Sequence, residues 1–98
     1  MYRGTTPTNV FNVDIDLTSA TELYISYEQN KEVIVEKELS DATITETSVS
    51  VTLTQAETLL FQPGKVFVQI RAKFSDGTAV ASNIITTTAE RILKDGAI

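Results

Sequence analysis

Hydrophobic and polar residues alternate over most of this chain. In one run, Leu23, Ile25 and Tyr27 occupy every second position. A period of two places these side chains on one face of a β-strand and their neighbours on the other face. Runs with similar patterning extend over 11–17, 32–39, 42–46, 49–53, 66–74 and 78–88. The pattern predicts about seven strands, of which the first is a long strand with one apolar face made of Phe11, Val13, Ile15 and Leu17.

Turn residues separate these runs. Gln29-Asn30-Lys31 predicts the turn of a hairpin between the second and third strands. Ser75-Asp76-Gly77 predicts another hairpin turn. The Asp-Gly pair favours type I′, a turn that needs positive φ at both of its central residues. We expect this turn to be the tightest of the protein.

One short segment departs from the strand pattern. In Thr54-Gln55-Ala56-Glu57 a Thr precedes a Glu by three residues, which is the pattern of a capping box at a helix start. Pro63 and Gly64 then stop the segment, because Pro disfavours helical geometry in the residue before it. The sequence predicts a helical turn from about Gln55 to Leu60 as the only regular helix.

Composition and length agree with a single all-β domain. The chain has 98 residues, and its fifteen Thr, nine Val and nine Ile give it the β-branched composition typical of strands. No repeat or linker divides it, so residues 1–98 are expected to form one domain. About seven short antiparallel strands with one short helical turn favour an immunoglobulin-like antiparallel β-sandwich over a closed barrel. Residues 1–7 are expected to form an N-terminal arm and residues 90–98 a C-terminal tail.

The absence of Cys and His removes most common catalytic and metal-binding chemistry. The net charge of -5 disfavours binding to the phosphate backbone of nucleic acid. No apolar run reaches the roughly 18 to 20 residues of a membrane helix, and the first ten residues lack the pattern of a secretory signal. We therefore expect a protein that is not an enzyme, has no cofactor or metal, and has neither nucleic acid nor a membrane as partner.

Two pairs of carboxylates are the candidates for chemistry. Asp14 and Asp16 share one face of the predicted first strand, where their oxygens are suited to a calcium ion. Glu36 and Glu38 share another strand face, as the two carboxylates of a glycosidase would. Lys37 between them instead indicates a charged sheet edge that resists strand addition. Acidic residues are common on solvated strand faces, and a domain of this size has little material for the cleft of a glycosidase, so we expect both pairs to be solvated.

Surface residues on one strand are candidates for protein contacts. Phe67, Gln69 and Arg71 lie opposite the apolar positions of their strand and make a mixed apolar and cationic strip. Aromatic residues and Arg are enriched at interface hot spots, although an Arg that snorkels beside a surface Phe gives the same pattern. Asn83 interrupts the alternation of its run and is expected to face inward, with its amide bonded to a loop backbone.

The two ends supply four further candidate interface residues. Tyr2 and Arg3 precede Pro7 in an arm suited to lie on a sheet edge, and Ile92 and Leu93 add apolar surface to a charged tail. Unpaired strand edges accept strands from other chains. Either end is equally able to fold back onto its own sandwich, and the sequence leaves both alternatives open.

Four segments of the chain resemble a family of small phage and prophage proteins of Gram-positive bacteria. These segments are YRGTTPT, VSVTLTQAETL, PGKVFVQIRAKFSDGTAVASNII and ERILKDG. The family is found among tail and baseplate structural genes. The resemblance implies a virion structural protein that contacts other phage structural proteins or further copies of itself. It also implies a location in the virion, and in the host cytoplasm before assembly, and it implies no site residue.

A small carbohydrate-binding or adhesion module is the alternative function. Carbohydrate sites present exposed aromatic platforms, on which sugar rings stack. The chain has no Trp and three Tyr, of which Tyr2 and Tyr24 are expected to be exposed. This scarcity of aromatic residues favours the virion structural protein.

Overall fold

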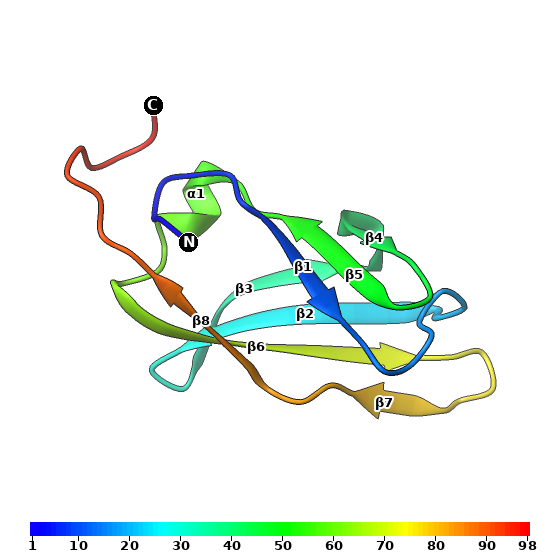
Figure 1. The fold of residues 1–98 in the computed structure, drawn as a ribbon. Helices are drawn as coiled ribbons and strands as arrows, with labels where there is room; N and C mark the ends of the chain where they lie inside the picture. The colour runs from blue at the N-terminus through cyan, green and yellow to red at the C-terminus, as the bar shows by residue number, and fades with distance from the viewer.

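Two antiparallel sheets face each other and form an all-β sandwich, as the sequence predicts (Figure 1). The computed structural model describes residues 1–98. The smaller sheet has the order β1-β5-β4, with β1 at Thr8–Asn12, β5 at Ser48–Thr52 and β4 at Ala42–Ile44. The larger sheet has the order β3-β2-β6, with β3 at Glu32–Glu38, β2 at Glu22–Gln29 and β6 at Gly64–Lys73. Two short strands pair with successive parts of the far edge of β6, namely β7 at Ala79–Ala81 and β8 at Ile85–Ala89.

The strand order is immunoglobulin-like. Immunoglobulin domains have strands A, B, E and D in one sheet and C, F and G in the other, and variable domains add C′ beside C. Here β1, β5 and β4 correspond to B, E and D, while β3, β2, β6 and the β7-β8 pair correspond to C′, C, F and G. No strand pairs with the outer edge of β1, where strand A would lie.

Alternation along the strands builds the core between the sheets. Leu23, Ile25 and Tyr27 of β2 and Val49 and Val51 of β5 are each at most 1% exposed. Burying one such aliphatic or aromatic side chain contributes about 1.5 to 3 kcal/mol. The predicted inward positions of these two strands are confirmed, and their burial holds the sheets together.

Strand β1 is shorter than the sequence predicts. It ends at Asn12, whereas the alternation extended to Leu17. The carboxylate of Asp16 accepts hydrogen bonds from the backbone N–H (2.9 Å) and the hydroxyl (2.6 Å) of Thr18. Such local bonds favour a turn over a strand. Leu17 still enters the core, but Ile15 is 45% exposed, so the prediction of one long strand is wrong beyond Asn12.

The predicted capping box forms at the start of helix α1, which spans Gln55–Thr58. The Oγ1 atom of Thr54 accepts the backbone N–H of Glu57 at 3.1 Å, and Oε1 of Glu57 accepts the backbone N–H of Thr54 at 2.8 Å. The helix ends before the predicted Leu60. Its location in the connection between β5 and β6 is confirmed.

A second helical segment was not predicted. The 3-10 turn η1 at Leu39–Asp41 links β3 of the larger sheet to β4 of the smaller one. The carboxylate of Asp41 accepts the backbone N–H of Glu38 at 2.9 Å and so caps the turn. This connection closes one side of the sandwich.

The type I′ turn lies in the other hairpin. Between β2 and β3, Asn30 has φ 52° and Lys31 has φ 63°, the pair of positive values that type I′ requires. At the predicted site, Asp76-Gly77, only the Gly has positive φ, at 89°. There the carbonyl of Phe74 accepts the N–H of Gly77 at 3.0 Å, and the N–H of Phe74 donates to the carbonyl of Thr78 at 2.9 Å. This is a three-residue loop, so the predicted type I′ turn at Asp76-Gly77 is wrong.

The last predicted strand, 78–88, is broken into β7 and β8 at Ser82. The Ser82 hydroxyl accepts the backbone N–H of Ile70 at 3.0 Å, while the Ser82 N–H donates to the Ile70 carbonyl at 2.8 Å. A side chain thus replaces a backbone partner in the ladder, and the register on β6 changes between β7 and β8. Asn83, predicted to face inward, is exposed because the chain leaves the sheet at this point.

Candidate functional site

The predicted strip lies on the outer face of the larger sheet, which points away from the smaller sheet. Phe67 is 37% exposed and Arg71 is exposed, while their neighbours Val68 and Ile70 are buried in the core. Gln69 is half-buried, and its Nε2 donates to the carbonyl of Ser82 at 3.0 Å. The strip therefore has one anchored amide between an exposed aromatic ring and an exposed guanidinium.

The strip continues as two facing columns of side chains, one on β2 and one on β6. The antiparallel register between the strands aligns these columns row by row. The four rows are Glu22 with Lys73, Tyr24 with Arg71, Ser26 with Gln69, and Glu28 with Phe67. Side chains directly opposite each other on one sheet face are close neighbours. We call these eight residues the β2 column and the β6 column.

Charges on this face are segregated. On this face, four Glu of β2 and β3 lie at positions 22, 28, 36 and 38, and the cations Lys65, Arg71 and Lys73 lie on β6. The structure has two ion pairs, Arg3–Asp95 and Lys37–Glu57, and neither involves these side chains. The face is thus acidic on one side and basic on the other, and its charged groups make no ion pairs within the chain.

The N-terminal arm lies on its own sandwich. Tyr2 forms a parallel bridge with Glu90, just beyond β8, and is 57% exposed. Arg3 is half-buried: its Nε donates to the carbonyl of Phe61 at 2.6 Å and its Nη2 to that of Leu59 at 3.0 Å. Of the two alternatives for this arm, the structure adopts the one in which it folds back, and Tyr2 alone presents a large exposed side chain.

The two candidate apolar residues of the C-terminal tail, Ile92 and Leu93, are placed differently. Ile92 is half-buried, and its Cδ1 would lie 3.0 Å from a Cβ built on Gly4. Gly4 has φ 71°, so this close approach needs Gly both for its backbone and for its lack of a side chain. Leu93 is 90% exposed. The tail therefore packs at Ile92 and presents Leu93 to solvent.

The candidate carboxylate pairs do not form a cluster. Asp14 and Asp16 lie in the loop after β1 rather than on one strand face. Hydrogen bonds from Thr18 lower the pKa of Asp16. Glu36 and Glu38 share the exposed side of β3. No three acidic side chains come together in a group suited to a metal ion.

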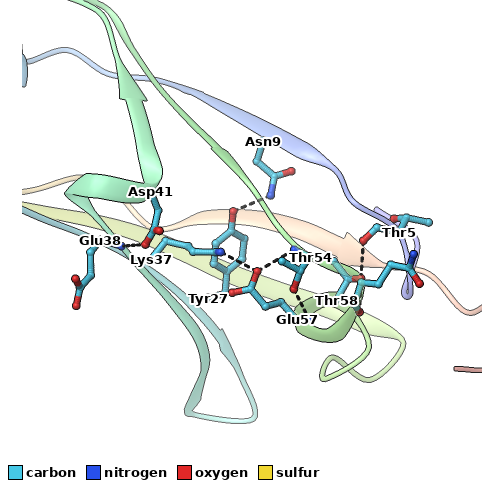
Figure 2. Close-up of polar contacts among 10 residues, drawn as sticks. Thr5, Asn9, Tyr27, Lys37, Glu38, Asp41, Thr54, Glu57 and Thr58 are labelled. Carbon is cyan, nitrogen blue, oxygen red and sulfur yellow. Dashed lines mark hydrogen bonds and ion pairs between the residues drawn. The ribbon is translucent and has the colours of Figure 1, made fainter. Parts of the chain in front are cut away.

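A polar cluster that the sequence analysis missed lies at the α1 end of the sandwich, and Figure 2 shows it. The Lys37 ammonium points toward α1 and lies 2.8 Å from the carboxylate of Glu57. This differs from the expected charged edge, because position 37 pairs with the buried Ile25 and so faces inward. The alternation along β3 could have predicted this inward position of Lys37. Partial burial raises the pKa of Glu57, but the bonds with Lys37 and Thr54 outweigh it and lower the pKa below its ordinary value.

Tyr27 belongs to the same end of the sandwich. Asn9 of β1 donates from Nδ2 to the Tyr27 hydroxyl at 2.7 Å, which links the two sheets (Figure 2). Burial, opposed by this hydrogen bond, raises the pKa of Tyr27 to about 12. The ring also packs against Phe11 and Phe61, with centroids 6.5 and 6.0 Å away. The polar groups at this end of the sandwich are bonded to one another. The Asn9–Tyr27 bond joins the two sheets, and the Lys37–Glu57 pair joins β3 to α1.

A cavity of about 300 Å³ opens between the end of β1 and the edge formed by β7 and β8. Eight of its twelve lining residues are hydrophobic, among them Leu17, Ile70 and Val80. Asp14 is the single charged residue in the lining. Its remaining lining residues are polar: Asn12, Asp14, Ser82 and Asn83.

Comparisons with known proteins find no family model, no curated protein and no solved structure that matches the chain. No helix has the length and apolar character needed to cross a membrane.

Proposed function

We propose that this protein is a non-catalytic structural or accessory component of a phage or prophage virion, in the tail or baseplate, and acts through protein–protein contacts. The observation that carries this proposal is the outer face of the larger sheet. There Tyr24 is 38% exposed and Phe67 is 37% exposed, with Arg71 in the row of Tyr24. Aromatic residues and Arg are the side chains most enriched at the energetic centres of interfaces.

The rigidity of this face supports the proposal. Every residue of the two columns lies on β2 or β6, and β6 pairs with β2 along seven registered positions from Glu22–Lys73 to Glu28–Phe67. Strand pairing holds the backbone of these positions in place before a partner arrives. A preorganised surface loses less conformational entropy on binding than a loop does.

The resemblance to phage tail and baseplate proteins indicates the assembly in which this face would act. In that setting the partners are other phage structural proteins or further copies of this chain, and the protein resides in the virion after its synthesis in the host cytoplasm. A repeated assembly requires weak, directional surfaces more than it requires a catalytic pocket. The charge-segregated face has such a direction, because rotating a partner by 180° in the plane of the face reverses every charge contact.

A carbohydrate-binding module is the second candidate, favoured by the exposure of Tyr2 (57%) and Tyr24 (38%). The two rings lie in different parts of the fold, one on the N-terminal arm and one on the outer face of β2. Specific binding to a glycan array, abolished by Tyr24→Ala, would favour this candidate over a structural component.

The proposal is tested by the protein content of purified particles. We expect particles from an induced host to contain this chain at a fixed copy number, and to retain it through density-gradient purification. Particles complemented with Arg71→Glu/Lys73→Glu should lack it. Particles complemented with Arg91→Glu/Lys94→Glu, which has the same charge change in the tail, should keep it. Its absence from wild-type particles would contradict the proposal.

A further inference from the structure

We propose that the outer face of the larger sheet binds the same face of a second copy of this chain in a two-fold symmetric dimer. The inference rests on the proposed function, because it names the partner of the same face. It follows from the order of the charges in the two columns rather than from their number.

The register fixes how a symmetric contact would align. Consider a two-fold axis that runs parallel to the strands, between β2 and β6, in the plane of contact. It brings the β6 column of the second copy over the β2 column of the first, and the reverse. Each row then meets the same row of the other copy, because the axis leaves positions along the strands unchanged.

This alignment pairs opposite charges at one end of the face. Lys73 of the second copy meets Glu22, and Arg71 of the second copy meets the ring of Tyr24. A guanidinium over a Tyr ring is a favourable cation–π contact. In the next row, Gln69 of the second copy meets Ser26. By symmetry each contact occurs twice.

Apolar surface lies at the other end of the face. Phe67 of the second copy meets the row of Glu28, beside Val33, which is 51% exposed. Lys65 lies two residues from Phe67 on the same side of β6, so in the second copy it is the cation of β6 nearest to the row of Glu28. The contact therefore buries aromatic and aliphatic atoms while no carboxylate of either β2 column faces another.

Charge complementarity selects a second copy over other partners. A uniformly acidic partner would meet Glu22 and Glu28, and a uniformly basic one would meet Lys65, Arg71 and Lys73. A partner face with acidic residues on one side and basic residues on the other complements both columns, and this chain itself carries such a face. Like charges placed opposite each other are unfavourable, so the pattern also rejects wrong alignments.

The size of the face indicates a weak dimer. Four strands spaced by about 4.8 Å and seven rows of about 3.4 Å give roughly 450 Å² of sheet face per copy. Twice this area falls below the roughly 1,200 Å² of stable complexes. Association should therefore appear at high protein concentration, as in an assembly that holds copies close together.

The experiment is a charge exchange between two variants, followed by sedimentation equilibrium up to millimolar concentration. Arg71→Glu/Lys73→Glu makes both columns acidic, and Glu22→Lys/Glu28→Lys makes both columns basic. We expect each variant alone to associate at least tenfold more weakly than the wild-type chain. An equimolar mixture of the two should form a heterodimer, because the columns are complementary again. Arg91→Glu/Lys94→Glu, which carries the same charge change as the first variant outside the face, should associate like the wild type.

Three results would overturn the proposal: a monomeric wild type at millimolar concentration, unchanged association of the first variant, or no association in the mixture. Circular dichroism melts check that the variants are folded. If a variant does not fold, dilution of the wild type followed by amide chemical shifts gives the same answer, since the shifts must map to the two columns. A chain that is monomeric in solution yet present in particles would refute this dimer and leave the proposed function intact.

Discussion

Lys37 and Glu57 form a 2.8 Å ion pair that joins edge strand β3 to helix α1. The same carboxylate oxygen accepts the backbone N–H of Thr54, so one side chain both caps the helix and holds it against the larger sheet. The side chains of Lys37 and Glu57 are only 13% and 24% exposed. This arrangement makes the stability of the protein depend on the charge of Glu57.

Acid should therefore destabilise the protein through Glu57. Its pKa is lowered in the folded state, so the stabilisation is fully present above the ordinary pKa of 4.5 and is lost as the pH falls through the folded value. We expect Glu57→Gln to lower the free energy of unfolding at pH 7 by on the order of 1 kcal/mol, and to flatten its dependence on pH below 4.5. Urea unfolding from pH 3 to 7 measures both effects. Glu46→Gln, in an exposed loop, is the control, and an equal effect there would contradict the assignment.

Alkali should destabilise the protein through Tyr27. Its pKa is raised to about 12, so the stabilisation from burying the neutral phenol is fully present below pH 10 and is lost as the pH approaches 12. Tyr27→Phe should remove this part of the pH dependence. At pH 7 the substitution should cost about 1 to 3 kcal/mol, because it leaves the Asn9 amide without its partner. Denaturant unfolding at pH 9 and pH 11 tests this, and a variant with the pH dependence of the wild type would refute it.

Alternation predicts the two central strands well, because burial of one face decides their geometry. The inward positions of β2 and β6 follow from period two alone, and the Thr54–Glu57 spacing locates the helix. The two errors in strand length share a physical cause: local side-chain bonds to the backbone overrode the pattern. The bonds from Thr18 to Asp16 form a turn inside the predicted first strand, and Ser82 replaced a backbone partner of Ile70 and split the last strand. Neither bond leaves a trace in hydrophobic periodicity.

The outer face of the larger sheet could be predicted in part, because alternation decides which side chains of a strand share a face. The positions of Phe67 and Arg71 on the outer face follow from the alternation of β6. The rows that align them with β2 do not, because pairing between distant strands depends on the whole fold. The inward position of Lys37 was within reach of the pattern, since it lies two residues from the buried Val35.

The two hairpin turns should respond oppositely to substitution. Lys31 has φ 63°, a strained value for a residue with a side chain, so Lys31→Gly should stabilise the protein by up to about 1 kcal/mol. Gly77 has φ 89°, so Gly77→Val should destabilise it by about 1 kcal/mol or more, although nothing lies within 4 Å of an added Cβ. Thermal melts of the two variants measure this pair of effects. Equal melting temperatures would refute the turn assignments.

The ends should contribute to stability only where they pack. Arg3→Ala removes two hydrogen bonds to backbone carbonyls and should cost about 1 to 3 kcal/mol, whereas Tyr2→Ala should cost less than about 0.5 kcal/mol. In the tail, Ile92→Ala should lower the melting temperature and Leu93→Ala should not, since Leu93 is 90% exposed. Differential scanning calorimetry of the four variants would contradict this account if Leu93→Ala proved as costly as Ile92→Ala.

The most direct test of the central claim is a map of amide chemical shifts while the wild-type protein is diluted from millimolar to micromolar concentration. The proposed dimer places the outer face of the larger sheet against the same face of a second copy. It predicts concentration-dependent shifts for Tyr24, Phe67, Gln69 and Arg71, and constant shifts for Thr43 and Thr52 on the outer face of the smaller sheet. Shifts confined to the smaller sheet or to the two ends, or spectra that do not change with concentration, would contradict it.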